Sequence, residues 1–216
     1  MARSLGLGMN FALWFFRSKI QPIFFAAIFI VTLFFAPYTH AQESVFTLDP
    51  SKSTVEFTLG ASLHTVHGTF KLKSGEIHFD PAKGTASGSI VVDALSGESG
   101  NESRDKKMHQ EILETPKFSE IVFVPSRIQG TIAPQGTSQV AVAGVMKLHG
   151  KDHEMTLNFA VQPGTQGQPA VATATFSVPY VKWGLKNPST FLLRVTDSVD
   201  VDVHASGQLT ASSLSH

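Results

Sequence analysis

Residues 199–204 read Val-Asp-Val-Asp-Val-His, so every second residue is apolar and the residues between are charged or polar. Successive side chains of a β-strand point to opposite faces of the sheet. This spacing therefore predicts a strand with one face buried and the other in water. The stretch favours a β protein over a helical one.

The same period of two extends through most of residues 45–207, for example in Thr54–Leu59 and Val140–Leu148. Short turn sequences containing Pro and Gly, such as Asp80–Gly84, separate the alternating runs. Alternating strands joined in series by short turns predict antiparallel hairpins that close into a barrel or pack as a sandwich. We therefore expect an all-β fold in a single domain.

The apolar side of each predicted strand identifies the side chains that should point into the fold. A closed barrel of about eight strands can enclose a small apolar ligand, whereas composition alone favours an ordinary packed core. The residues predicted to face inward, and to line the lumen if there is one, are Val55, Phe57, Phe70, Phe79, Ile90, Met146, Leu157, Phe159, Phe176, Val199 and Val201.

One stretch interrupts the alternation and predicts a short helix over residues 101–114. Ser99 and Glu102 have the spacing of a capping box, with Ser99 as the N-cap. Thr115-Pro116 ends the helix, because the residue before a proline avoids helical angles. The charged run 104–107 is most simply a solvated face of this helix; alternatively, one of its side chains reaches the sheet and fixes the helix in place.

The N-terminal segment has the layout of a secretory signal peptide. Arg17 and Lys19 precede an uncharged apolar run, residues 23–36, and Thr39-His40-Ala41 places small residues at the −3 and −1 positions of a cleavage site. The run is shorter than the roughly 20 apolar residues of a membrane-spanning helix. We expect residues 1–41 to be removed, residues 42–216 to form the mature domain, and export to the periplasm or medium.

This expectation has a direct test. N-terminal sequencing of the protein recovered from the periplasm should give Gln42 as the first residue. Retention of residues 1–41 in the membrane fraction would contradict it.

Composition excludes several classes of function. The chain has 17 basic and 17 acidic residues and no basic cluster, which argues against nucleic-acid binding. It has no cysteine, so disulfides, thiolate zinc sites, iron–sulfur clusters and a cysteine nucleophile are excluded. Neither a phosphate-binding loop nor a dinucleotide fingerprint nor a paired-carboxylate motif is present.

Nine histidines raise the question of a metal site. His64 and His67 are three residues apart in extended chain, where their side chains diverge. His149 and His153 flank a predicted hairpin turn, and Glu154 could supply a third ligand. The simpler interpretation is that His149 and His153 are solvated turn residues, and we expect no metal centre.

Several motifs, taken together, resemble the YceI-like lipid- and polyisoprenoid-binding family. Residues 46–57 are similar to its opening strand, and Val66-His67-Gly68-Thr69-Phe70 to its V-x-G-x-F strand. Residues 103–109 resemble its R-D-x-H-L helix, 118–123 the F-x-x-(I/V)-x-F that follows, and 142–150 its G-x-L-x-L-H-G hairpin. The resemblance covers about residues 44–208.

Three departures from the family pattern stand out. Met108-His109 only approximates the family's His-Leu pair. Phe46 occupies a position where tryptophan is usual. Residues 178–191 replace the more common segment containing N-R-x-D-F-G. If this segment frames the opening of a barrel, the choice of ligand could differ from that of other members.

The resemblance implies an extended lipocalin-like antiparallel β-barrel that encloses an isoprenoid lipid, such as a quinone tail. It favours a ligand tunnel over a packed core, with no cofactor required beyond a bound polyisoprenoid or quinone. It also implies a periplasmic carrier that contacts the membrane or membrane-bound partners transiently; both a monomer and a dimer are compatible. Two alternatives remain: an enzyme acting on an apolar isoprenoid-like substrate, and a metal- or haem-associated protein that uses its histidines.

Overall fold

The computed structural model describes residues 43–165 and 167–211, which belong to the compact unit Ala41–His216. The predicted cleavage site and the apolar run before it lie outside the described residues. The strands are β1 (Ser44–Leu48), β2 (Thr54–Leu59), β3 (Val66–Asp80), β4 (Thr85–Glu98), β5 (Glu120–Gln129), β6 (Ser138–Leu148), β7 (Lys151–Gln162), β8 (Ala170–Val178) and β9 (Val199–Ala211).

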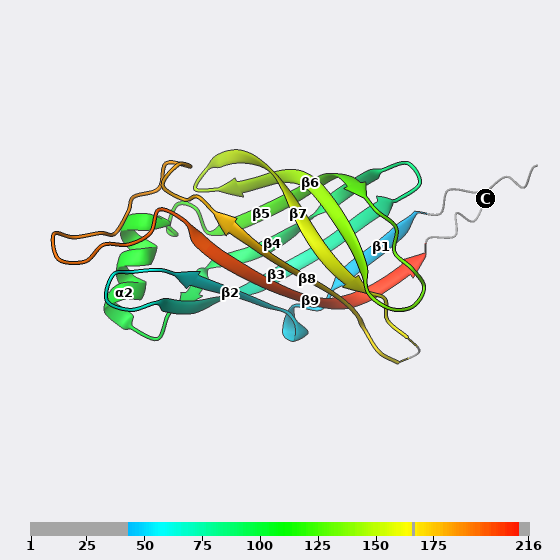
Figure 1. Ribbon diagram of the computed structural model, residues 1–216, viewed down its shortest axis with the longest axis horizontal. Coiled ribbons are helices and arrows are strands. Elements are labelled where there is room, and N and C mark those ends of the chain that lie inside the picture. Colours follow the sequence, from blue (N-terminus) through cyan, green and yellow to red (C-terminus); the bar gives the residue numbers. More distant parts are fainter. Residues whose placement is uncertain (1–42, 166, 212–216) are drawn as a thin grey trace, which may run out of the picture. The chain divides into compact units, whose positions relative to one another are not determined.

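These strands form one antiparallel sheet that closes on itself (Figure 1). From β3 to β9 each strand pairs with the next along the chain. β2 pairs with both β3 and β9 and completes the ring. β1 also pairs with both β3 and β9, further along the same two strands. β1 and β2 are therefore two halves of one strand position, and the expected eight-stranded barrel is confirmed.

The break between β1 and β2 is a single 3₁₀ turn, Pro50–Lys52. The Asp49 side chain caps this turn by accepting a hydrogen bond from the Ser51 backbone N–H. Ser53 returns the chain to the sheet, and its buried Oγ accepts a 2.9 Å hydrogen bond from the Ser206 N–H of β9. The seam between the first and last strands thus stays hydrogen-bonded across the interruption.

The alternation in the sequence matches the alternation in burial. In β6, Val140, Val142, Met146 and Leu148 are buried, whereas their neighbours Gln139 and Lys147 are exposed. Strand side chains alternate between the two faces, so the apolar parity faces the barrel interior.

The helical stretch lies between β4 and β5, as predicted, but begins differently. The α-helix α2 spans Glu102–Lys107 and continues as a π-helical turn, Met108–Ile112. The prediction that Ser99 is the N-cap is wrong: the Asn101 side chain accepts the capping hydrogen bond from the Arg104 N–H. Gly100, with φ of 74°, separates Ser99 from the helix, so Ser99 is too far back to cap it.

Figure 1 shows α2 at one end of the barrel, together with the β2–β3 loop and the long β8–β9 loop. The β3–β4, β5–β6 and β7–β8 turns lie at the other end. Among the described residues, no helix has the length and apolar character needed to cross a membrane.

Candidate functional site

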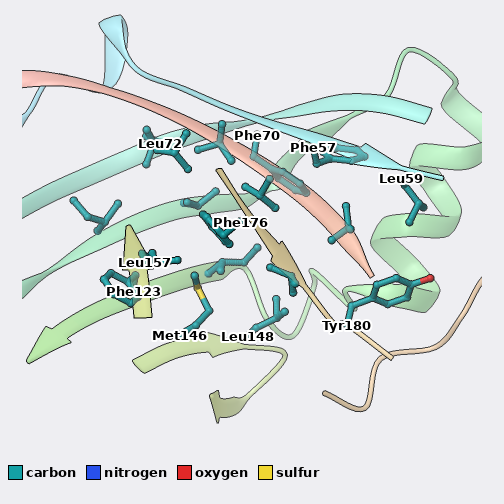
Figure 2. A pocket seen from close by; sticks show the side chains of 18 of the residues that line it. Phe57, Leu59, Phe70, Leu72, Phe123, Met146, Leu148, Leu157, Phe176 and Tyr180 are labelled. Carbon is teal, nitrogen blue, oxygen red and sulfur yellow. The ribbon is translucent and has the colours of Figure 1, made fainter. Parts of the chain in front are cut away.

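A cavity of about 630 Å³ occupies the interior of the barrel. Ligand pockets in proteins usually enclose about 300–1,000 Å³, so this cavity is large enough for a sizeable apolar molecule. Figure 2 shows Met146 and Leu157 near Phe176, with Phe57 and Phe70 on the opposite wall. Most of the wall consists of aliphatic and aromatic side chains.

The cavity reaches the surface at the α2 end. Its lining there includes His64, Asn101, Ser103 and Thr190, which are exposed to solvent. At the other end the lining includes Ile132 and other apolar residues that are at least half-buried. We call the opening at the α2 end the mouth.

All the residues that sequence alternation placed inside lie on the wall of this cavity. They come from seven of the strands and face one another across the lumen: Val55 and Phe57 from β2, Phe70 and Phe79 from β3, Ile90 from β4, Met146 from β6, Leu157 and Phe159 from β7, Phe176 from β8, and Val199 and Val201 from β9.

An aromatic pair lies on the lumen wall, Phe57 from β2 and Phe70 from β3. The rings of Phe57 and Phe70 lie 5.3 Å apart between centroids, at an interplanar angle of 43°. Gly68 lies directly opposite Phe57 in the β2–β3 register, and the Phe57 ring covers it so closely that a Cβ at this position would overlap the ring. The glycine of the V-x-G-x-F motif is therefore required by packing within the wall.

The segment after β8 supplies part of the mouth, and no periodicity in it predicts which of its residues face inward. Tyr180, Trp183 and Leu185 line the cavity. The Tyr180 hydroxyl donates a 2.6 Å hydrogen bond to the Thr196 carbonyl, which ties the two ends of the β8–β9 loop together. Burial raises the pKa of Tyr180 to about 12, so the hydroxyl stays protonated and keeps this bond.

Polar side chains of the helical stretch form another part of the mouth. Arg104 donates hydrogen bonds from Nε to Ser99 Oγ (2.6 Å) and from Nη2 to the Ser99 carbonyl (2.8 Å). The Asp105 carboxylate accepts hydrogen bonds from the Ser99 N–H and hydroxyl. The interpretation of residues 104–107 as a solvated face is therefore wrong for Arg104 and Asp105, which fix the helix to the end of β4.

His109 adds a further attachment, because its Nε2 lies 2.8 Å from the Gly97 carbonyl and its Nδ1 3.3 Å from Thr115 Oγ1. Lys107 lines the mouth and reaches only a distant partner, the Pro188 carbonyl at 3.5 Å. The residues of the R-D-x-H tract thus hold the helix across the open end of the barrel.

His149 and His153 are not the solvated turn residues that the sequence suggested. The His149 ring packs on Phe118, 4.5 Å between centroids, and its Nε2 lies 3.2 Å from Glu114 Oε1. The His153 ring stacks on Trp183 at 4.1 Å and 4°. Both stacking partners come from distant parts of the chain, so local spacing could not reveal them.

The stacked His153 predicts a pH effect on stability. Burial, and secondarily the charge of Lys151, lowers the pKa of His153 from its ordinary 6.5, while Asp152 opposes the shift. The unfolded chain takes up this proton first as the pH falls below 6.5, so the free energy of unfolding should decrease from there down to the lowered folded-state pKa.

Urea unfolding at pH 7.5 and 5.5, compared between the wild type and His153→Phe, isolates this contribution from that of the other histidines. Phenylalanine keeps an aromatic ring against Trp183 and carries no titrating group. The variant should lose less stability between the two pH values; an equal loss would contradict the prediction.

Among residues 43–165 and 167–211, no three His, Asp or Glu side chains come together as a metal-binding group. His64 is exposed in the loop before β3, whereas His67 on the strand lies 3.1 Å from Thr58 Oγ1 through its Nδ1. The described geometry therefore gives no support to the histidine-dependent alternative.

Comparison with protein families finds that the model of the YceI-like domain matches residues 46–206. A UPF0312 protein of Vibrio cholerae is 26% identical over 148 residues, covering 66% of this chain and 74% of that protein. A UPF0312 protein of Pseudomonas putida is 28% identical over 149 residues, covering 66% and 73%.

Solved structures share the fold. BcnA of Burkholderia cenocepacia superposes with a TM-score of 0.60 at 20% identity, over 76% of this chain and 99% of that one. A polyisoprenoid-binding domain from Saccharophagus degradans, implicated in plant cell wall breakdown, superposes with a TM-score of 0.56 at 16% identity, over 77% and 98%. At these identities the likeness establishes a common architecture.

Proposed function

Because this chain belongs to the YceI-like domain family, we propose that its barrel binds an isoprenoid lipid in the lumen and carries it through an aqueous compartment. The observation that carries the proposal is the apolar cavity of about 630 Å³, open at one end. The proposed binding site consists of the eleven inward-facing residues described above, of which Val55 is the first in the chain and Val201 the last.

The physical chemistry of the wall suits a long hydrocarbon ligand. Each methylene transferred from water to an apolar site contributes roughly 0.8 kcal/mol, so a prenyl chain gains most of its affinity from the length that is enclosed. The lumen wall offers mainly side chains such as Leu157 and Phe176, which need no hydrogen-bonding partner in the ligand. Binding of this kind requires neither a cofactor nor a catalytic group.

The shared fold with the Saccharophagus degradans domain supports an isoprenoid over other lipids. A quinone tail is the specific ligand that we propose. Export through the N-terminal segment, with residence in the periplasm, completes the proposed carrier role, because a shuttle between membranes must lie between them.

The polar groups at the mouth favour binding over catalysis. Arg104, Asp105 and His109 are hydrogen-bonded to the backbone or side chains of the β4 end, which leaves them occupied as anchors. An enzyme acting on an isoprenoid would need a polar group aimed at a reacting atom. We therefore propose a binding protein.

Organic extraction of the protein purified from a bacterium, followed by mass spectrometry, tests the proposal. A prenyl lipid near one molecule per chain is the expected result. When a short-chain ubiquinone is added to protein that was purified empty, the fluorescence of Trp183 should be quenched. Palmitate should change this fluorescence less. The proposal would be overturned if no prenyl lipid were extracted and ubiquinone caused no quenching. Elemental analysis that found stoichiometric metal in place of lipid would also overturn it.

A further inference from the structure

Three large apolar side chains project into solvent beside the mouth. Leu63 is 78% exposed, Phe191 98% and Leu192 83%. Among the described residues one other large apolar side chain, Leu95 on β4, is also exposed, at 56%. Single exposed apolar residues are normal, whereas a group of them marks a site of interaction. We call Leu63, Phe191 and Leu192 the apolar tip.

The apolar tip comes from two loops that hydrogen bonds join. The Ser62 N–H donates to the Arg194 carbonyl at 2.9 Å, and the Arg194 N–H donates to Ser62 Oγ at 3.2 Å. One step further in, the Thr196 N–H donates to the Gly60 carbonyl at 2.9 Å. These bonds hold the β2–β3 and β8–β9 loops side by side, so Leu63 and the turn that carries the other two residues lie on one joined pair of loops.

Phe191 and Leu192 occupy the centre of a closed turn. The Thr190 N–H donates to the Leu193 carbonyl at 2.8 Å, and the Leu193 N–H donates to Thr190 Oγ1 at 3.1 Å. Central turn positions usually carry Gly, Asn, Asp, Ser or Pro, because those residues fit the backbone or bond to it. Phe191 and Leu192 form no such hydrogen bond in the turn, and because they are almost fully exposed they bury little apolar surface on folding.

The turn residues connect the apolar tip with the cavity. Thr190 and Leu193 line the cavity from the β8–β9 loop, and Ala61 and His64 line it from the β2–β3 loop. The apolar tip therefore stands on the rim of the mouth. Figure 1 shows the two loops that carry it at the α2 end of the barrel.

The two loops that carry the apolar tip are positively charged. Lys182, Lys186 and Arg194 are exposed on the β8–β9 loop, and residues 180–196 contain no Asp or Glu. Asp197 follows, and its carboxylate accepts a 2.7 Å hydrogen bond from Asn187 Nδ2. The β2–β3 loop, residues 60–65, has no acidic residue either.

We propose that the apolar tip inserts into the surface of an anionic phospholipid bilayer and holds the mouth against it. Aromatic and leucine side chains flanked by Lys and Arg are the usual combination for interfacial membrane binding. A protein partner would need roughly 800 Å² on each side, far more than a narrow turn and one leucine supply. The inference extends the proposed function, since an apolar ligand then passes between bilayer and lumen without crossing water.

The absence of cysteine makes a local test possible. Thr65→Cys places one thiol on the β2–β3 loop without altering the apolar tip, and Gln135→Cys places one on the β5–β6 loop at the opposite end. Each protein carries an environment-sensitive NBD label and is mixed with vesicles of phosphatidylethanolamine and phosphatidylglycerol that contain a nitroxide-labelled lipid.

The label at 65 should shift to the blue and be quenched, and the label at 135 should not. Adding Phe191→Ser and Leu192→Ser should raise the vesicle concentration needed for half the signal at least tenfold. Leu95→Ser, which removes an exposed leucine elsewhere, should leave it unchanged. Phosphatidylcholine vesicles or 0.5 M salt should weaken the response, because salt screens exposed charges.

Equal responses at 65 and 135 would overturn the inference, because any other attachment, including one through residues 23–36, brings both labels to the membrane without preferring the tip. Insensitivity to the double serine substitution would also overturn it. Lipid found by extraction together with a silent label at 65 would reject docking and leave the carrier function standing. A responsive label on a protein that never binds lipid would reject the carrier function instead.

Discussion

Replacing Phe159 by aspartate should lower the lipid content of the purified protein at least tenfold. Phe159 points from β7 into the cavity, among apolar side chains. A carboxylate placed there loses its water without gaining a partner, which costs several kcal/mol when a hydrocarbon fills the lumen. Each 1.4 kcal/mol is a factor of ten in affinity, so a tenfold loss is the smallest effect expected.

The neighbouring residue provides the matched control. Asn158 is exposed on the outer face of the same strand, so Asn158→Asp adds the same carboxylate without changing the lumen. Phe159→Asn separates the loss of the ring from the charge. Because burial raises the pKa of a carboxyl group, the Phe159→Asp protein should regain part of its lipid at pH 5. Normal folding with full lipid content at pH 8 would show that Phe159 does not contact the ligand.

The largest expected effect on stability comes from Gly88→Ala, which should lower the free energy of unfolding by about 3 kcal/mol or more. Gly88 lies on β4 opposite Ile77 with φ of 101°, where the β4–β5 register is also irregular. A Cβ at this position would overlap the backbone carbonyl of Glu76, which cannot rotate away. Strained backbone and steric overlap in the sheet therefore add together.

Gly136→Ala separates these two causes. Gly136 also has a positive φ, 77°, but nothing lies within 4 Å of a Cβ built on it. Its substitution should cost only about 1 kcal/mol, the penalty of a non-glycine residue in the left-handed region. Urea denaturation of both variants gives the comparison; equal losses would mean that the Glu76 carbonyl moves aside.

The barrel and its inward face could be predicted because strand geometry ties sequence parity to direction. Once Val199 and Val201 are assigned to one face, Asp200 and Asp202 must lie on the other, whatever the rest of the chain does. The same rule places Met146 on one strand of a hairpin and Leu157 on the other, with both side chains pointing inward. Local spacing carries this information completely.

The mouth could not be predicted in the same way, because long-range contacts determine it. The sequence predicts Arg104 to be part of a solvated helix face. Arg104 fixes the helix to the end of β4 only because the chain turns at Gly100 and brings Ser99 within hydrogen-bonding distance. His153 pairs with Trp183 across the gap between β7 and the β8–β9 loop. Neither a period of two nor a helical period applies to irregular loops, so no local pattern indicates such partners.

The split strand at the seam has a kinetic consequence. Ser53 and Ser206, which hydrogen-bond there, are 153 residues apart in the chain, so the ring closes only when nearly the whole polypeptide is available. Contacts between distant residues form slowly, because the entropy of closing a long loop is lost before the pairing compensates for it. The pairs of strands from β3 to β9 follow one another in the chain, so their closures are much shorter than that of the seam, and they can form first as an open, curved sheet. The same apolar face that holds a ligand in the closed barrel is exposed on that intermediate, so during this interval the chain is most prone to aggregate.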